Sequence, residues 1–322
     1  NRVTHLVQML ESLHHRGLER NSYLVFAAIN ACKQCGDSGT AFSMIEEMVT
    51  SRVQLDTMTF NAAINVCAKG GAWTKALGLL ANMAATSVKL DTITFNAAVS
   101  ACASGGEWLR ALGLLAEMEA NSVDKDTITY NAAVSSCEKS GQWAQALGLL
   151  FAMSGSRVEL STISYNAALS AAAKGGEWAR ALLLWAEMPA CHVELTTITY
   201  SATVTACAKG GEWTKALGVL DAMMASHVEA DTIVYSTAVS ACEKGGEWVQ
   251  ALGLLFDMAA KSLEMNSITY NAAISACAKS GEWTKALGVL DAMMASHVEA
   301  DTIVYSTAVS ACEKGGEWVQ AL

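Results

Sequence analysis

The chain has 322 residues, of which 52% are hydrophobic, and its 31 acidic and 21 basic side chains leave a net charge of −10. No apolar run reaches the roughly 18–20 residues that a membrane-spanning helix needs, so we expect no membrane span. The acidic balance disfavours indiscriminate nucleic-acid binding, which depends on neutralising phosphates, but it leaves recognition of single bases open.

The sequence repeats with a period of 35 residues. Residues 57–91 align without a gap on residues 92–126, and the same register recurs at Ser22, Thr127, Thr162, Thr197, Thr232, Ser267 and Thr302. A fixed period of about 20–50 residues is typical of a solenoid of stacked units. We predict eight complete repeats over 22–301, the second half of a preceding repeat over 1–21 and the first half of a further repeat over 302–322, in an array truncated at both ends.

Each repeat divides at a glycine pair such as Gly70-Gly71. Residues 57–69 carry apolar side chains at the i, i+3, i+4, i+7 spacing of one helical face, and residues 73–83 repeat that pattern. We therefore predict two antiparallel helices per repeat, helix A and helix B, followed by a link near 87–90. Such a hairpin cannot bury its own apolar face, so we expect it to stack on its neighbours. Positions within a repeat are counted from Thr57, the first, to Asp91, the last.

The chain has ten cysteines, and eight of them occupy the eleventh position of a repeat: Cys32, Cys67, Cys102, Cys137, Cys207, Cys242, Cys277 and Cys312. One cysteine per repeat predicts a packing column, because free cysteine behaves as a small hydrophobe. Cys32-x-x-Cys35 has the spacing of a metal or redox pair, but no second pair accompanies it. We expect no metal site and a reduced, intracellular protein.

Two further columns have less obvious roles. A tryptophan begins helix B at Trp73, Trp108, Trp143, Trp178, Trp213, Trp248, Trp283 and Trp318. We predict that this column packs between repeats; a base-stacking platform is the alternative. A glycine recurs within helix B at Gly78, Gly113, Gly148, Gly218, Gly253 and Gly288. Each costs about 1 kcal/mol relative to alanine, and we expect close approach of neighbouring helices to explain it.

The repeat resembles a known family. Helix A opens with Thr127-Ile128-Thr129-Tyr130-Asn131, and helix B carries Ala181-Leu182 and closes with Glu187-Met188. With the 35-residue period, these features resemble the pentatricopeptide repeat family over all 322 residues, whereas the W-x2-L-G-x2-Y signature of the 34-residue tetratricopeptide class is absent. The resemblance implies an all-α fold, a right-handed α-solenoid superhelix of helix-turn-helix repeats. One departure is that the family's usual proline before the last position is missing, as in residues 88–91.

The resemblance also implies binding of single-stranded RNA, one nucleotide per repeat, with the base edge read by the fifth and last residues. These pairs are Asn61/Asp91, Asn96/Asp126, Asn131/Ser161, Asn166/Thr196, Ser201/Asp231, Ser236/Asn266 and Asn271/Asp301. Under the family's pairing rules they suggest 5′-UUCCGAU-3′. An asparagine amide can donate to uracil O4 or accept from its N3–H, whereas a short serine leaves room for a purine. The repeat 22–56 has Phe26 at the fifth position and is expected to be silent.

Two more columns complete the expected RNA site. The resemblance implies that second-position residues sandwich the bases: Met58, Ile93, Ile128, Ile163, Ile198, Ile233 and Ile268. Lysines at position thirteen would contact phosphates: Lys69, Lys139, Lys174, Lys209, Lys244 and Lys279. Structural explanations stay open for the last-position column and for the lysine column. Last-position Asp, Asn, Ser and Thr are preferred helix N-caps, and a lysine at the end of a helix favours the helix dipole. We expect most acidic side chains to lie on helix B and the links.

The resemblance implies a role in RNA processing, stability or translation in an organelle, the chloroplast or the mitochondrion. The alternative is a scaffold subunit of a large organellar assembly, such as a ribosome, that binds through protein contacts. We expect no enzyme and no cofactor, because no zinc cluster of the kind deaminases require and no phosphate-cradling glycine loop occurs. His192, His227 and His297 fall in links, where solvated side chains are expected.

Overall fold

The computed structural model describes residues 22–50 and 55–316. The half repeat predicted for 1–21, the side chain of Cys35 and Trp318 lie outside the described part of the chain. The described residues form α-helices and no strand. Their bounds are α2 Ser22–Cys35, α3 Ser38–Thr50, α4 Thr57–Lys69, α5 Trp73–Ala85, α6 Thr92–Gly105, α7 Trp108–Ala120, α8 Thr127–Lys139, α9 Trp143–Gly155, α10 Thr162–Gly175, α11 Trp178–Glu187, α12 Thr197–Gly210, α13 Trp213–Ala225, α14 Thr232–Gly245, α15 Trp248–Ala260, α16 Ser267–Lys279, α17 Trp283–Ala295 and α18 Thr302–Gly315.

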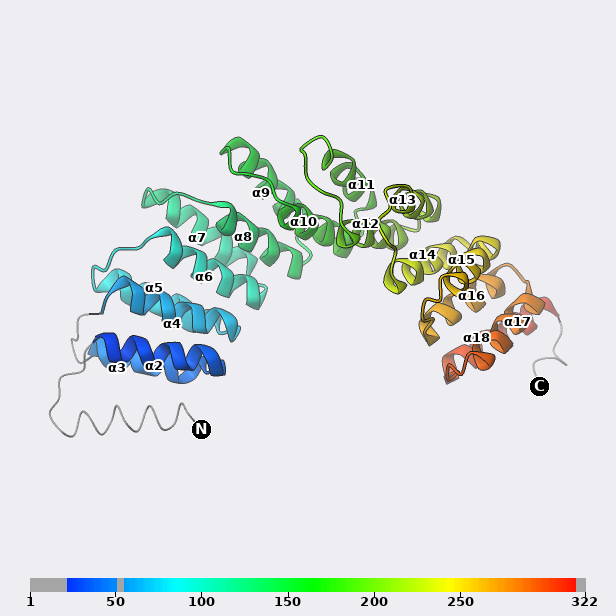
Figure 1. Cartoon of the computed structure of the whole chain (residues 1–322), viewed down its shortest axis with the longest axis horizontal. Helices are drawn as coiled ribbons and strands as arrows, with labels where there is room; N and C mark the ends of the chain where they lie inside the picture. The colour runs from blue at the N-terminus through cyan, green and yellow to red at the C-terminus, as the bar shows by residue number, and fades with distance from the viewer. Residues whose placement is uncertain (1–21, 51–54, 317–322) are drawn as a thin grey trace. The chain divides into compact units, whose positions relative to one another are not determined.

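The chain divides into two compact bodies, an N-terminal body of Asn1–Ala168 and a C-terminal body of Leu169–Leu322. In each body an even-numbered helix is helix A of a hairpin, and the next odd-numbered helix is its helix B. Within a body, helix A packs on its own helix B and on the helix A of the next hairpin, as α4 does on α5 and α6, and α14 on α15 and α16 (Figure 1). The predicted all-α solenoid of helix-turn-helix repeats is confirmed.

Helix boundaries follow from local chemistry. Helix A ends at a glycine in the left-handed region, such as Gly246 with φ 73°, a conformation that an L side chain adopts only at a cost. Helix α11 has 10 residues where most B helices have 13. Pro189 follows it closely, and proline lacks the backbone N–H that would continue the helical hydrogen bonds.

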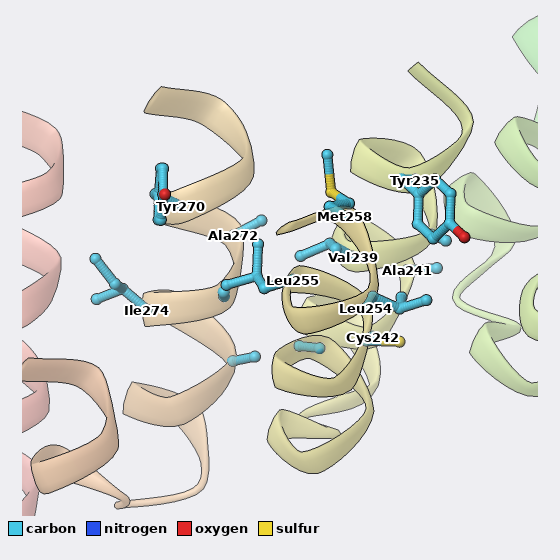
Figure 2. Close-up of a cluster of buried hydrophobic side chains, with 14 of the residues drawn as sticks. Tyr235, Val239, Ala241, Cys242, Leu254, Leu255, Met258, Tyr270, Ala272 and Ile274 are labelled. Carbon is cyan, nitrogen blue, oxygen red and sulfur yellow. The ribbon is translucent and has the colours of Figure 1, made fainter. Parts of the chain in front are cut away.

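The core of the C-terminal body lies between the A and B layers of successive hairpins. Figure 2 shows its centre. The buried side chains there include Val239 and Cys242 from α14, Leu254, Leu255 and Met258 from α15, and Ile274 from α16. Burying one Leu, Ile or Met side chain stabilises by about 1.5–3 kcal/mol. Because every hairpin contributes to its neighbours' core, this stabilisation is shared between adjacent hairpins.

The eleventh-position cysteines are all buried, which confirms the predicted packing column. Burial raises the pKa of Cys102, Cys207, Cys242 and Cys277 to about 11. Cys191, in contrast, is exposed near the C-terminal end of α11. Within the described ranges no group of three His, Cys, Asp or Glu side chains is placed to hold a metal ion, and no helix there is long and apolar enough to cross a bilayer.

Iodoacetamide at pH 8 is expected to modify Cys191 at least about a hundredfold faster than Cys242. The thiolate is the reacting form, and a thiol with a pKa of about 11 holds roughly one part in a thousand as thiolate at that pH. Peptide mapping by mass spectrometry after timed exposure measures the rates. In unfolded protein both cysteines should react at similar rates, and equally fast labelling in the folded protein would contradict the prediction.

The tryptophan column packs between hairpins, as predicted. Trp178, Trp213 and Trp283 each lie against the first glycine of the pair in the next hairpin, so that a Cβ at Gly210, Gly245 or Gly315 would overlap the indole ring. The first glycine of the pair is therefore a packing requirement at these sites, and the second glycine is the turn residue.

The explanation expected for the glycines within helix B is wrong at most positions. Gly78 meets the ring of Phe42 at 3.4 Å, but a Cβ at Gly113, Gly148, Gly218, Gly253 or Gly288 would find no neighbouring atom within 4 Å. No close approach of helices requires glycine at these five positions. The helical glycines therefore cost stability without a packing reason.

The links contain a left-handed residue at position 31 that is not glycine: Ser87, Ser122, Arg157, His192, His227, Ser262 and His297, with φ between 54° and 58°. An L residue in this region costs roughly 1–2 kcal/mol relative to glycine. The three link histidines are exposed, as predicted.

Candidate nucleic-acid interface

A row of exposed apolar side chains follows the first turn of the A helices. The second-position residues, here called the apolar row, are 62–67% exposed: Met58, Ile93, Ile128 and Ile163 in the N-terminal body and Ile198, Ile233 and Ile268 in the C-terminal body. A single exposed hydrophobic residue is ordinary, whereas one at the same place in seven successive hairpins makes a repeated apolar surface of the kind that marks interaction sites. The predicted base-sandwiching residues are thus accessible.

Asn96, at the fifth position, is held at both ends of its amide. Its Nδ2 donates to both carboxylate oxygens of Asp126, at 3.0 and 3.1 Å. Its Oδ1 lies 2.5 Å from the hydroxyl of Thr129 in the next hairpin, and the single hydrogen of that hydroxyl is shared between this oxygen and Oδ1 of Asp126 at 2.8 Å. The side chain of Asn96 is 9% exposed, so it lies under the surface of the helix A layer rather than in bulk water.

Asn61 repeats this arrangement. Its Nδ2 donates to Asp91 at 3.3 Å, and its Oδ1 accepts from the hydroxyl of Thr94 at 2.6 Å. The fifth and last positions are therefore linked directly by a hydrogen bond in both hairpins, across a sequence separation of 30 residues. The third-position threonine, which was not among the predicted site residues, completes each cluster.

The last-position residues are also helix N-caps. Asp91, Asp126, Asp231, Asn266 and Asp301 each accept a hydrogen bond from the backbone N–H three residues on. The capping explanation is therefore correct for these residues. It does not compete with base reading, because Asp91 and Asp126 contact the fifth-position amide and cap the helix with the same carboxylate.

The carboxylate of Asp126 stays ionised at neutral pH. Burial acts to raise its pKa, but hydrogen bonds from the backbone and hydroxyl of Thr129 and from the amide of Asn96 outweigh burial and bring the pKa below its usual value. The same balance lowers the pKa of Asp91, through Thr94 and Asn61. Each cluster thus holds a fixed negative charge next to the amide it positions.

The remaining pairs differ from this pattern. Asn131 donates to Ser161 at 3.3 Å, but its Oδ1 is buried without a partner, and so is Oδ1 of Asn271, whose expected partner is Asp301. Ser236 contacts the hydroxyl of Thr269 at 2.7 Å, and Thr269 donates to Asn266 at 2.9 Å, so this pair is linked through the threonine.

The last two pairs are Ser201/Asp231 and Asn166/Thr196. Ser201 is half-buried on α12, and Asp231 accepts from the backbone of Val234 at 2.9 Å. Asn166 is half-buried on α10 in the N-terminal body, and Thr196 precedes α12 in the C-terminal body.

A hollow of about 340 Å³ brings the predicted columns together on α12, α14 and α16. Its walls include two members of the apolar row, the readout pair Ser236/Asn266, two lysines and two hydroxyl side chains at the ninth position. The residues that carry the argument are Ile233, Ile268, Ser236, Asn266, Lys209, Lys244, Thr205 and Ser240. Apolar, hydrogen-bonding and cationic groups thus share one open surface, which suits a ligand with a flat face, a polar edge and a negative charge.

The six position-thirteen lysines are all exposed. Each ends or nearly ends a helix A, so the dipole explanation applies as well. Lys139 donates to the backbone oxygen of Ser104 at 3.1 Å, and Lys279 pairs with Glu243 at 3.2 Å. Glu243 lies on helix A, unlike most acidic residues, and it reduces the positive charge that Lys279 offers.

Sequence reasoning missed the third-position hydroxyls and the ninth-position Ser and Thr. Both recur in most repeats, as at Thr94 and Thr129 or Thr205 and Ser240, so the signal was present as a column. The partners of Thr94 and Thr129 were not visible in the column, because Asn61 and Asn96 belong to the preceding hairpin.

Comparison with known proteins agrees with these features. A family model described as the pentacotripeptide-repeat region of PRORP matches residues 14–182 and 63–230, and a PPR repeat model matches residues 233–263 and 268–298. Comparison with the curated proteins finds no match.

Three solved structures are similar to the chain. The pentatricopeptide repeat protein PPR10 in complex with an 18-nt psaJ RNA element is 20% identical with a TM-score of 0.61, over 100% of this chain and 52% of that one. PPR10 from maize is 18% identical with a TM-score of 0.45, over 98% and 54%. The PPR domain of Arabidopsis thaliana protein-only RNase P 1 in complex with tRNA is 16% identical with a TM-score of 0.47, over 53% and 90%.

The chain spans about half the length of the PPR10 chain that it matches. The likeness to that structure, with its TM-score of 0.61, shows the helical-repeat fold. The family models together cover more than half of the sequence. The protein therefore belongs to the pentatricopeptide repeat family.

Proposed function

We propose that this protein binds single-stranded RNA along the helix A surface, one nucleotide per hairpin, and that it acts by binding rather than by catalysis. The observation that carries this proposal is the apolar row. Seven side chains at one position are left 62–67% exposed next to polar fifth-position residues. A side chain exposed to this degree contributes little to the core, but it can grip the flat face of a base while the neighbouring polar group meets the base edge. The RNA bound in the similar PPR10 structure supports the same function.

The bases would be read by the pairs from Asn61/Asp91 to Asn271/Asp301, which suggests 5′-UUCCGAU-3′ in eight repeats over 22–301. Exposed lysines such as Lys209 and Lys244 would contact phosphates beside the hollow. Lys279 would contribute less, because Glu243 already pairs with it. The protein would act in a chloroplast or mitochondrion, where occupying its site would stabilise, process or control translation of a transcript.

A second function is favoured by a different surface. Phe151 on α9 and Phe256 on α15 occupy the same position of their B helices and are 74% and 75% exposed. Exposed aromatic side chains are enriched at protein–protein contacts. A scaffold role in an organellar assembly would use these helix B side chains, and it is compatible with RNA on the helix A surface.

Binding of labelled RNA by fluorescence anisotropy tests the proposed function. We expect UUCCGAU within a neutral flanking sequence to bind at least about tenfold more tightly than the scrambled CAUGUCU, which corresponds to about 1.4 kcal/mol. The two RNAs have equal charge, so phosphate contacts alone would bind them equally. Weak and equal binding of both would contradict base reading and leave the scaffold role as the better explanation.

A further inference from the structure

We propose that the third-position hydroxyl of each helix A fixes which group the fifth-position asparagine of the preceding hairpin presents, and so sets how strictly that site distinguishes uracil from cytosine. This inference rests on the proposed RNA-binding function. It names a positioning residue outside the fifth and last positions. It predicts that two sites with the same readout pair discriminate between uracil and cytosine to different degrees.

The clamp is complete at Asn96. Thr129 donates to its Oδ1 at 2.5 Å, and its Nδ2 donates to Asp126 at 3.0 Å. Turning the amide over would place its oxygen against the carboxylate, where both groups are acceptors, and would take Oδ1 away from the threonine hydroxyl that satisfies it. The amide is therefore held in one orientation by the last residue on one side and the third-position hydroxyl on the other.

This orientation determines what the amide offers a base. The amide oxygen contacts Thr129, and Nδ2 contacts both carboxylate oxygens of Asp126. One Nδ2 hydrogen shared between the two carboxylate oxygens leaves the second Nδ2 hydrogen for a base. A fixed donor at the base edge suits O4 of uracil and opposes the N4 amino group of cytosine, which is itself a donor. Asn61, held by Thr94 and Asp91, is predicted to behave in the same way.

The clamp is absent at Asn271. The third-position residue of the next hairpin is Val304, which is fully buried and has no hydroxyl. Oδ1 of Asn271 is buried without a hydrogen-bond partner. A buried acceptor without a donor is unfavourable, and rotation of the amide toward a base would relieve it. The site can then present either its oxygen or its nitrogen, so it accepts cytosine as well as uracil although its pair, Asn271/Asp301, is the same as at Asn96.

Asn131 supports the same reasoning. Its next third-position residue is Ser164, whose hydroxyl donates to the backbone oxygen of Ser161 at 2.8 Å instead of to the amide. Oδ1 of Asn131 is left buried without a partner. Among the described residues, the two buried amide oxygens without a partner thus occur where the hydroxyl is missing or turned away.

The test exchanges the two kinds of site. In the wild-type protein, replacing the second U by C (UCCCGAU) is expected to weaken binding about five- to tenfold more than replacing the last U by C (UUCCGAC), as one lost hydrogen bond would. T129V should remove this extra penalty at the second U. V304T should create it at the last U. T129S keeps the hydroxyl and should keep the wild-type discrimination.

The substitutions are suited to the fold. Val234 and Val304 already occupy the third position in two hairpins, and the N-caps before them remain formed, with Val234 N–H donating to Asp231 at 2.9 Å. Thermal unfolding should confirm that T129V is folded. A general loss of structure would weaken both RNAs equally, whereas loss of the clamp changes their ratio.

The outcomes separate the two proposals. Wild-type protein that binds UUCCGAU and CAUGUCU equally overturns the proposed function and this inference with it. Wild-type protein that prefers UUCCGAU, with T129V and V304T leaving both U-to-C penalties unchanged, overturns the inference alone. Reciprocal shifts in the two variants, with T129S like the wild type, establish the third-position hydroxyl as a specificity determinant.

Discussion

Replacing Ile198, Ile233 and Ile268 together by alanine is expected to weaken binding of UUCCGAU by at least about a hundredfold while leaving the unfolding temperature nearly unchanged. By analogy with aromatic stacking, each contact with a base face contributes roughly 1–3 kcal/mol, and about 3 kcal/mol is already more than a hundredfold. The three side chains are 63–67% exposed, so their removal opens no cavity in the core.

The matched control removes apolar area of similar exposure from the B helices. Leu183, Val249 and Phe256 are 62%, 56% and 75% exposed in the same C-terminal body. Their combined change to alanine should leave RNA affinity within about twofold. Anisotropy titrations of both triple variants, with circular dichroism melts, measure the difference. Equal loss in both, or no loss in the Ile variant, would contradict a role for the apolar row in gripping bases.

Changing the five helix B glycines Gly113, Gly148, Gly218, Gly253 and Gly288 to alanine is expected to stabilise the protein by about 2.5–5 kcal/mol in total. Each change contributes roughly 0.5–1 kcal/mol, because alanine loses less backbone freedom on folding. A Cβ at each of these positions meets no atom within 4 Å, so no strain offsets the gain. Contributions in a repeat protein add approximately over its units.

The first glycine of a pair, packed against a tryptophan, provides the opposite control. Gly245→Ala would push a Cβ into the ring of Trp213, and overpacking of this kind costs about 1–3 kcal/mol. Denaturant unfolding curves should therefore show a higher free energy of unfolding for the five-fold variant than for the wild type, and a lower one for G245A. A five-fold variant no more stable than the wild type would show that these glycines are required for a reason other than packing.

Much of the architecture could be predicted from the sequence. The 35-residue register located the hairpins, the i, i+3, i+4, i+7 spacing located the buried faces, and the eleventh-position cysteines proved to be buried as expected. These features are local or periodic, and a helix buries the face that carries its apolar residues wherever it packs. The N-cap role of the last position also followed from residue type, as Asp91 and Asp126 show.

The tertiary structure decided how neighbouring hairpins touch. The bond from Thr129 to Asn96 spans 33 residues, and the pair of Lys279 with Glu243 spans 36. The open space beside Gly218 and the contact of Trp213 with Gly245 likewise depend on how one hairpin is seated on the next. A repeating sequence shows which side chains each hairpin carries, but not how far one hairpin is rotated and shifted relative to the next. Those two quantities determine which groups meet, and they are set by the packing of whole helices against one another.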